Sequence, residues 1–142
     1  MNWIIKEFHE LTTKELYEIL KSRAEIFVKE QNITYVDEDD VDYRSLHVFT
    51  MEENRVIAYL RAFPEGNTVR IGRVLTLNHG HGIGTELVKY AVRELPKRLK
   101  CEKICMDAQK RAVPFYEKLG FQVTSDEYME EGIVHVDMEI SI

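Results

Sequence analysis

The feature that most constrains this 142-residue chain is a glycine-rich turn between an apolar strand pattern and a helical pattern. Residues 74–77 are largely apolar, and Gly80, Gly82 and Gly84 follow at alternate positions. A helical spacing of apolar residues begins directly after them. This order aims several backbone N–H groups and the positive end of a helix dipole at one spot, where a phosphate fits. Glycine suits such a turn because a side chain would block close approach and restrict φ and ψ.

Four interpretations of this turn compete. A P-loop needs a lysine before its Ser or Thr, but Thr85 follows Gly84 directly. A dinucleotide fold needs a third glycine where Thr85 stands, and Glu102 would precede a strand rather than end one. A plain tight turn needs no ligand at all. The fourth is the Gln/Arg-x-x-Gly-x-Gly/Ala turn that holds the pyrophosphate of coenzyme A in GNAT N-acetyltransferases; residues 79–84 resemble it, with His79 at the Gln/Arg position.

A second segment favours the fourth interpretation. Residues 108–121 resemble the other GNAT signature, Asn-x-x-Ala-x-x-x-Tyr followed by Lys-x-Gly-Phe. Gln109 stands at the Asn position, and Ala112, Tyr116 and Gly120 match directly. Because two signatures occur in the expected order and at a suitable separation, the chain is identified as a member of this superfamily by resemblance.

Further matches cover nearly the whole chain and resemble the ElaA-like branch of the superfamily. Gln at position 109 is expected in that branch. The matching positions are Arg23, Phe27, Glu30, Gln31, Tyr35, the aspartates of residues 37–42, His47, Arg61, Gly72, Arg73 and the Gly-Ile-x-His-x-x-Met motif of residues 132–138.

Periodicity predicts one mixed α/β domain over residues 1–142 with six or seven strands. The resemblance implies the GNAT acyl-CoA N-acyltransferase fold, in which helices flank a central, mostly antiparallel sheet. Thr12 and Glu15 form a capping-box pattern before a predicted helix. The next long helix is expected to end before Pro96, and Pro114 suits the start of a short one. Helices are predicted at 13–28, from 83 to before 96, and near 114–119; strands are predicted at 2–8, 46–51, 56–63, 68–77, 103–108, 121–124 and 133–140.

Composition narrows the function classes. A formal charge of −6 argues against a nucleic-acid partner. No apolar run is long enough to cross a membrane, and no secretion signal is recognised, so a cytoplasmic location is expected. Cys101 and Cys105 lack metal-ligand spacing, and the acidic run of residues 37–42 lacks the glycine and closing glutamate of a calcium loop, so no metal is predicted. That run is either a solvated loop or a wall that attracts an amine.

The resemblance implies an acetyl-CoA-dependent N-acetyltransferase that acts on a primary amine of a small molecule or peptide, by direct transfer in a ternary complex. A CoA-binding sensor without turnover is the alternative, and a homodimer is possible in such folds. In this reading Tyr116 is the general acid and the backbone N–H near Leu75 stabilises the oxyanion. The base remains open among Glu30, His47 and His135, each of which also has a purely structural interpretation.

The resemblance also implies two sets of binding residues. Those expected to bind acetyl-CoA are Val74, Leu75, Thr76, His79, Gly80, His81, Gly82, Ile83, Gly84, Thr85, Gln109, Ala112, Phe115 and Tyr116. Those expected to bind the acceptor are Arg23, Gln31, Asp39, Asp42 and Arg73. The basic residues 97–100 are either a solvated helix end or a contact for the ribose phosphate of coenzyme A.

Overall fold

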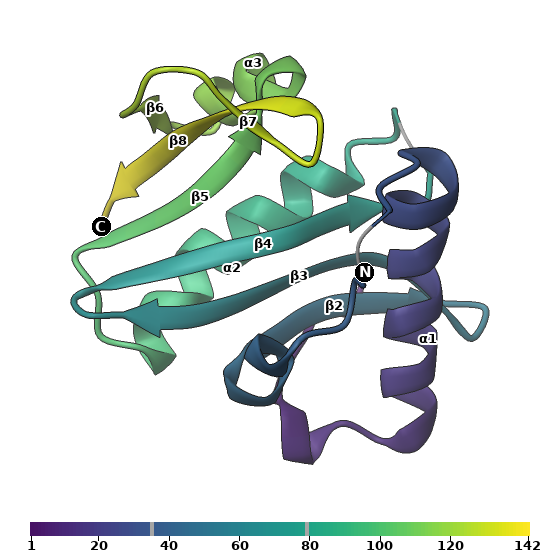
Figure 1. Ribbon diagram of the computed structural model, residues 1–142. Helices are drawn as coiled ribbons and strands as arrows, with labels where there is room; N and C mark the ends of the chain where they lie inside the picture. Colours follow the sequence, from purple (N-terminus) through teal and green to yellow (C-terminus); the bar gives the residue numbers. More distant parts are fainter. Residues whose placement is uncertain (35, 79) are drawn as a thin grey trace.

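The computed structural model describes residues 1–34, 36–78 and 80–142, and these residues build one sheet with helices on both faces (Figure 1). The strand order is β1-β2-β3-β4-β5-β8-β6, and β7 pairs with β8. β4 and β5 run parallel, whereas the other described pairings are antiparallel. The strands are β1 Ile4–Glu7, β2 Leu46–Glu52, β3 Arg55–Glu65, β4 Thr68–Thr76, β5 Lys103–Gln109, β6 Gln122–Val123, β7 Tyr128–Glu130 and β8 Ile133–Ser141.

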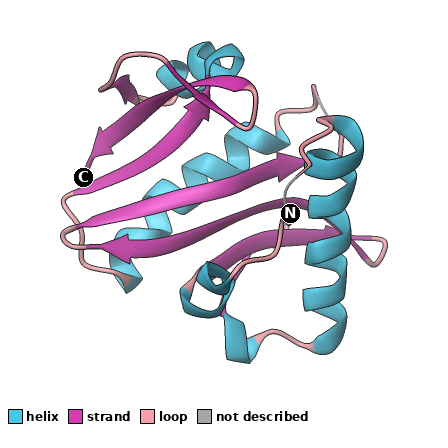
Figure 2. Cartoon of the chain, viewed as in Figure 1, coloured by secondary structure: helices cyan, strands magenta, loops and turns pink. Residues whose placement is uncertain are grey.

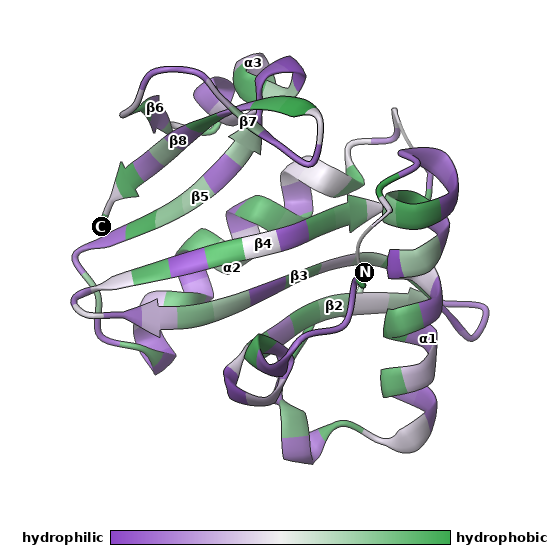
Figure 3. Cartoon of the chain, in the orientation of Figure 1, coloured by the Kyte–Doolittle hydropathy of each residue, from purple (hydrophilic) through white to green (hydrophobic). Residues whose placement is uncertain are grey.

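The two long helices lie on opposite faces of the sheet, as Figure 2 shows. Helix α1 packs Ile19 in one apolar cluster with Phe49 and Tyr59, and α2 packs Leu87 and Leu95 in a second, larger cluster. Hydrophobic and hydrophilic residues mix along both helices, as expected for elements that cover a core on one side (Figure 3). The helical segments are η1 Phe8–Glu10, α1 Thr13–Arg23, η2 Ala24–Glu30, η3 Asp40–Arg44, α2 Ile83–Arg98, η4 Lys110–Ala112 and α3 Val113–Lys118.

The first helix begins as predicted and ends differently. Thr12 Oγ1 accepts the Glu15 N–H at 3.0 Å, and Glu15 Oε1 accepts the Thr12 N–H at 2.9 Å, which confirms the capping box. After Arg23 the chain widens into the π-helix η2, whose last bond runs from the Gln31 N–H to the Ile26 carbonyl at 2.9 Å. Side-chain spacing does not distinguish a π turn from an α turn, so the sequence predicted a single α-helix over residues 13–28.

The strand count and several element boundaries also differ from the prediction. The sheet has eight strands rather than six or seven, because β7 is too short to show an alternating pattern. The first strand is shorter than the predicted 2–8. Helix α2 continues through Pro96 to Arg98, and the Leu99 N–H still donates to Leu95 at 2.8 Å. The final turn tolerates Pro96 because a proline there removes only one helical hydrogen bond.

Candidate active site

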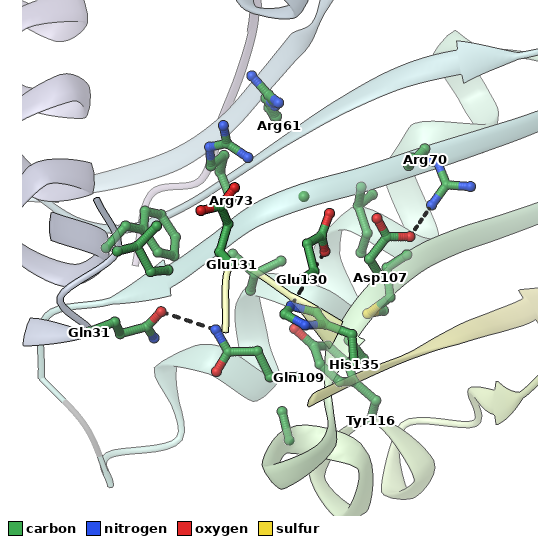
Figure 4. Close-up of a pocket in the computed structure, with 18 of the residues that line it drawn as sticks. Gln31, Arg61, Arg70, Arg73, Asp107, Gln109, Tyr116, Glu130, Glu131 and His135 are labelled. Carbon is green, nitrogen blue, oxygen red and sulfur yellow. Dashed lines mark hydrogen bonds and ion pairs between the residues drawn. The ribbon is translucent and has the colours of Figure 1, made fainter. Parts of the chain in front are cut away.

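The candidate site is a cleft where β4 and β5 separate. These strands pair only from Thr68 to Arg70, opposite Lys103 to Cys105, whereas β5 stays paired with β8 as far as Gln109 opposite His135. The resulting cleft has a volume of about 840 Å³. Its walls come from η2, the segment before η3, β3, β4, β5, η4, α3 and the β7–β8 turn (Figure 4).

A β-bulge in β4 lies at the point of separation. Tyr59 pairs with Leu75 and Arg61 with Gly72, so Leu60 alone opposes two residues of β4. One of those two is Arg73, whose φ of +51° lies in the left-handed region. A bulge bends its strand and increases the local twist. A non-glycine residue held at positive φ costs about 1–3 kcal/mol, so surrounding contacts must hold Arg73 there.

A network of three arginines and three aspartates lies at the cleft, with Asp39, Arg61 and Arg73 in its lining and Arg23, Asp37 and Asp42 behind them. Arg23 on α1 has no exposed surface; its Nε donates to Asp37 Oδ2 at 2.7 Å and its NH1 to Asp42 Oδ1 at 2.8 Å. Arg61 NH1 on β3 donates to Asp42 Oδ1 at 2.9 Å and to Asp39 Oδ1 at 2.6 Å. Three aspartates of the acidic run, Asp37, Asp39 and Asp42, thus each bind an arginine, so these three are not simply solvated, and Asp39 also lines the cleft.

These pairs keep the carboxylates ionised. Burial acts to raise the pKa of Asp42, but hydrogen bonds and charge from Arg23 and Arg61 outweigh it and lower that pKa below its ordinary value. The pKa of Asp39 is lowered in the same way, mainly by Arg61, against a smaller burial. Asp39 lines the cleft with 40% of its side chain exposed, whereas Arg23 and Asp42 lie below it. Arg23 and Asp42 thus take a supporting place rather than the acceptor contact predicted from sequence.

The two strand histidines have different surroundings. His47 is 1% exposed, and its Nε2 lies 2.9 Å from the Asp42 carbonyl while its Nδ1 lies 2.7 Å from the Tyr59 hydroxyl. Since a carbonyl only accepts, Nε2 carries the proton and Nδ1 accepts from Tyr59. Burial lowers the pKa of His47, so the ring stays neutral. His47 does not line the cleft, and both nitrogens are engaged, so the structure corrects its candidacy as a base.

His135 lies in the cleft wall beside Tyr116 (Figure 4). Its Nδ1 donates to the Ile133 carbonyl at 2.8 Å, which leaves the lone pair on Nε2. Nε2 is 3.5 Å from Glu130 Oε2, and the ring stacks on Tyr128 at 6.1 Å between centroids. His135 is 8% exposed, so the alternative interpretation of it as an outward-facing residue of the last strand is wrong.

Tyr116 is both packed and within reach of the cleft. It is 7% exposed, lines the cleft, and makes edge contacts with Phe115 and Phe121 at 5.0 and 5.8 Å between ring centroids. Burial raises the pKa of Tyr116 to about 12, so its phenol keeps its proton at neutral pH. Helix α3 therefore presents a protonated hydroxyl to the cleft.

The glycine turn joins β4 to α2 next to this helix. Gly82 caps α2 with φ +75°, and Gly80 has φ +84°. A Cβ built on either glycine meets no atom within 4 Å, so the space in front of the turn is open. Gly84 lies in a closer environment, since a Cβ built on it would stand 3.4 Å from Phe115 and 3.6 Å from Thr76. The turn and the Tyr116 helix are thus in close contact.

The other predicted cofactor residues surround the same turn. Ile83 is buried, Thr85 half-buried and His81 exposed. Val74, Gln109 and Ala112 line the cleft. His79, like Tyr35, lies outside the described residues. The basic residues 97–100 lie at the opposite end of the 16-residue α2, about 24 Å from the turn, so the structure gives no support to their contact with coenzyme A.

Two glutamines meet across the cleft. Gln109 Nε2 at the end of β5 donates to Gln31 Oε1 after η2 at 3.0 Å (Figure 4). The π turn ends at Glu30, which is exposed and lines the cleft with Gln31. The amide bridge connects the end of β5 with the segment after η2, and it brings together two residues from distant predicted segments.

Sequence reasoning missed several cleft residues. Arg61 was noticed only as a family match, yet it is 6% exposed and lines the wall. Arg70 on β4 and Asp107 on β5 are paired at 2.6 Å, although Arg70 stands opposite Cys105 in the sheet. Arg70 and Asp107 each lie between two buried strand residues, and this alternation was the sequence signal that could have identified them. Arg111, Glu130 and Glu131 also line the cleft, and no local pattern singled them out.

Within residues 1–34, 36–78 and 80–142, no helix combines the length and apolar character that a membrane crossing requires. The same ranges contain no group of three or more His, Cys, Asp or Glu side chains arranged for a metal ion.

Comparison with known proteins shows which family the chain belongs to. Residues 18–142 match the family model described as "Acetyltransferase (GNAT) domain". A UPF0039 protein of Schizosaccharomyces pombe is 34% identical over 147 residues, covering 100% of this chain and 98% of that protein. Protein ElaA of Escherichia coli is 27% identical over 145 residues, covering 97% and 95%.

Solved structures agree with the sequence matches. The crystal structure of Escherichia coli ElaA has a TM-score of 0.93 at 27% identity and covers 99% of this chain and 100% of its own. An acyl-CoA N-acyltransferase from Pseudomonas aeruginosa has a TM-score of 0.92 at 29% identity, with coverage of 99% and 100%. The fold and both signatures agree with these matches, and the chain belongs to the GNAT acetyltransferase family, in its ElaA-like branch.

Proposed function

We propose that this protein transfers the acetyl group of acetyl-CoA to a primary amine, directly, while both substrates are bound. The observation that carries the proposal is the cleft between β4 and β5, which has Tyr116 and His135 in its wall and the glycine turn beside it. Family membership supports the reaction class. The acceptor would enter from the side lined by Glu30, Gln31 and Asp39.

The glycine turn fits the pyrophosphate of coenzyme A. Gly80 and Gly82 hold left-handed conformations, and the open space where their Cβ atoms would lie admits a ligand close to the backbone. The N–H groups at the start of α2 would donate to the phosphates. When bound, acetyl-CoA supplies the thioester carbonyl that the amine attacks.

We expect the oxyanion donor to be the amide of a residue adjacent to Leu75 and not the Leu75 amide itself. The Leu77 N–H donates to the Ile57 carbonyl of β3 at 2.8 Å. N–H groups two residues apart on a strand point the same way, so the Leu75 N–H also faces β3, opposite Tyr59. The adjacent amides, on Val74 and Thr76, alternate to the edge that faces the cleft. We infer that these amides pair with the pantetheine arm and that one of them stabilises the charge on the thioester oxygen.

His135 is the best-placed base. A lysine-like amine has a pKa near ~10.4 and must lose its proton before it attacks, a handicap of roughly 4–5 kcal/mol at neutral pH. The Nε2 lone pair of His135 can take that proton, since Nδ1 is held by Ile133, and Glu130 at 3.5 Å would stabilise the resulting cation. The neutral amine adds to the thioester carbonyl and forms a tetrahedral oxyanion. As the carbonyl re-forms, the C–S bond breaks and the Tyr116 hydroxyl gives its proton to the leaving sulfur; the second proton, lost by the nitrogen, restores that hydroxyl through solvent.

The test removes the Nε2 lone pair while keeping the donor to Ile133. His135→Asn is expected to lower kcat/KM for the amine by about 10²–10⁴-fold, with the acetyl-CoA dissociation constant little changed. Thiol release against a panel of amines and calorimetry with acetyl-CoA measure the two quantities. Glu30→Gln, run in parallel, is expected to lower kcat/KM by less.

Three results would overturn parts of this proposal. A larger loss in Glu30→Gln than in His135→Asn would move the base to Glu30. Wild-type protein that binds acetyl-CoA but releases no thiol with any amine of the panel would be a binding module. Absence of acetyl-CoA binding would remove the proposed function altogether.

A further inference from the structure

The bulge residue Arg73 is held in place by Asp37. Arg73 Nε donates to Asp37 Oδ1 at 2.9 Å, and Arg73 NH2 donates to the Asp37 carbonyl at 3.0 Å. Both bonds reach the same residue from a side chain whose own backbone has φ +51°. The tether therefore acts at the one residue of β4 that bends the strand away from β5.

Asp37 is itself fixed from the opposite side. Arg23 Nε donates to Asp37 Oδ2 at 2.7 Å, and Arg23 NH2 donates to the Asp37 carbonyl at 2.9 Å. Asp37 is 4% exposed and Arg23 is 0% exposed on α1. Each carboxylate oxygen thus takes one arginine, and the carbonyl takes both. A buried aspartate with this set of charge-assisted bonds has one position, set by the helix.

The tether and the bulge together decide the shape of the cleft. Pairing between β4 and β5 stops at Arg70, three residues before Arg73, and the amides of Val74 and Thr76 follow shortly after it. If Arg73 moved to an ordinary strand conformation, the bulge would disappear and the register between β3 and β4 would shift by one residue. These amides would then point to the opposite edge of β4, because alternate residues of a strand face opposite edges.

We propose that Asp37 is a positioning residue for acetyl transfer: through Arg73 it holds the β4 bulge, which keeps the cleft open and aims the following amides into it. The proposal rests on the function proposed above. Asp37 touches neither substrate in this account, and its effect reaches the reaction through the backbone of β4.

The first experiment separates the conformation of residue 73 from its side chain. Arg73→Ala and Arg73→Gly both remove the guanidinium, but glycine accepts φ +51° without strain whereas alanine does not. We expect kcat to be at least about 10-fold lower in Arg73→Ala than in Arg73→Gly, with both below wild type. Equal kcat in the two variants, with the loss confined to KM for the amine, would mean that Arg73 only contacts the acceptor and would overturn the proposal.

The second experiment is a double-mutant cycle. Asp37→Asn in the wild-type background is expected to lower kcat by at least about 10-fold, and in the Arg73→Gly background by no more than about 3-fold. The matched control is Asp42→Asn, which also removes a carboxylate from Arg23; its effects in the two backgrounds should be equal. Equal losses for Asp37→Asn in both backgrounds would overturn the proposal.

Folding and function are checked separately. Rates are divided by the folded fraction from thermal unfolding, and the Arg73 pair remains decisive if Asp37→Asn does not fold, because that pair leaves the Arg23–Asp37 contact in place. Calorimetric affinity for acetyl-CoA gives a second readout of the cleft. If the wild-type protein turns over acetyl-CoA but the cycle shows no coupling between Asp37→Asn and Arg73→Gly, this inference alone is wrong. If the wild-type protein neither binds nor turns over acetyl-CoA, the proposed function is wrong as well.

Discussion

At the scale of single residues, burial and partners separate side chains that look equivalent in the sequence. His47 and His135 both stand in alternating strand patterns. Both nitrogens of His47 are hydrogen-bonded, to Asp42 and Tyr59, whereas His135 lines the cleft and only its Nδ1 is bonded to a carbonyl, that of Ile133. Tyr116 illustrates a second case. An aromatic pair on a short helix predicts core packing, and the packing is present, but the cleft reaches the same ring.

Tyr116→Phe tests whether the phenol proton matters. Burial raises the pKa of Tyr116 to about 12, so the hydroxyl is protonated and able to donate throughout the neutral range. Phenylalanine keeps the ring and its contacts with Phe115 and Phe121. We expect kcat to fall by about 10²–10⁴-fold, with thermal stability and acetyl-CoA affinity little changed. Wild-type turnover in the variant, under conditions where chemistry limits the rate, would make Tyr116 a packing residue.

At the scale of elements, the glycine turn and α2 form one unit. The turn needs positive φ at Gly80 and Gly82, and the helix then begins at Ile83 and runs to Arg98 against the larger core. Gly84 lets its first turn approach Phe115. The geometry of the turn is therefore a consequence of how a strand is joined to a helix, and its positive φ angles favour glycine at Gly80 and Gly82.

Gly82→Val is expected to weaken acetyl-CoA binding by at least ~10-fold, about 1.4 kcal/mol, because the added side chain would occupy the space proposed for the pyrophosphate. The matched control is Gly66→Val. Gly66 has φ +62°, has no atom within 4 Å of a built Cβ, and lies in the β3–β4 turn at the other end of β4. The backbone strain is thus shared, while only Gly82 adjoins the proposed site. Calorimetry on both folded variants decides; equal affinities would remove the phosphate-binding interpretation.

At the scale of the whole molecule, the arginine–aspartate network connects α1, the segment before η3, β3 and β4. Arg23 on α1 and Arg61 on β3 share Asp42, and Asp37 links Arg23 to the bulge. The network therefore holds together the elements around the cleft. Removing one partner of a buried pair destabilises strongly, since the other charge is left uncompensated.

This network predicts acid sensitivity. The folded pKa values of Asp39 and Asp42 lie below the ordinary 3.8, so their contribution to stability is fully present above about pH 4 and is lost as pH falls through the lowered values. We expect the melting temperature to decline as pH falls below about 4 and the decline to be shallower in Asp42→Asn, which starts from a lower melting temperature. Thermal unfolding across this pH range measures both slopes. Parallel slopes in the two proteins would show that Asp42 does not contribute to the pH dependence.

The sequence by itself determined the family, the order of most elements and the two signatures of the cofactor side. These are local properties: a capping box such as Thr12 with Glu15, a turn that requires glycine at Gly82, and a strand alternation such as that of β8 are each set by neighbouring residues. The same local rules predicted the helix that carries Tyr116.

Only the tertiary structure decided which polar residues are buried, which meet, and where the strands part. Arg23, Asp37 and Arg73 are far apart in the chain, and nothing local indicates that they bind one another. The positive φ of Arg73 needs those distant contacts, because an isolated arginine in a strand would not adopt it. The cleft wall around Arg61, Arg73 and Asp39 is made of such long-range contacts, and sequence spacing therefore predicted residues of this wall without their geometry.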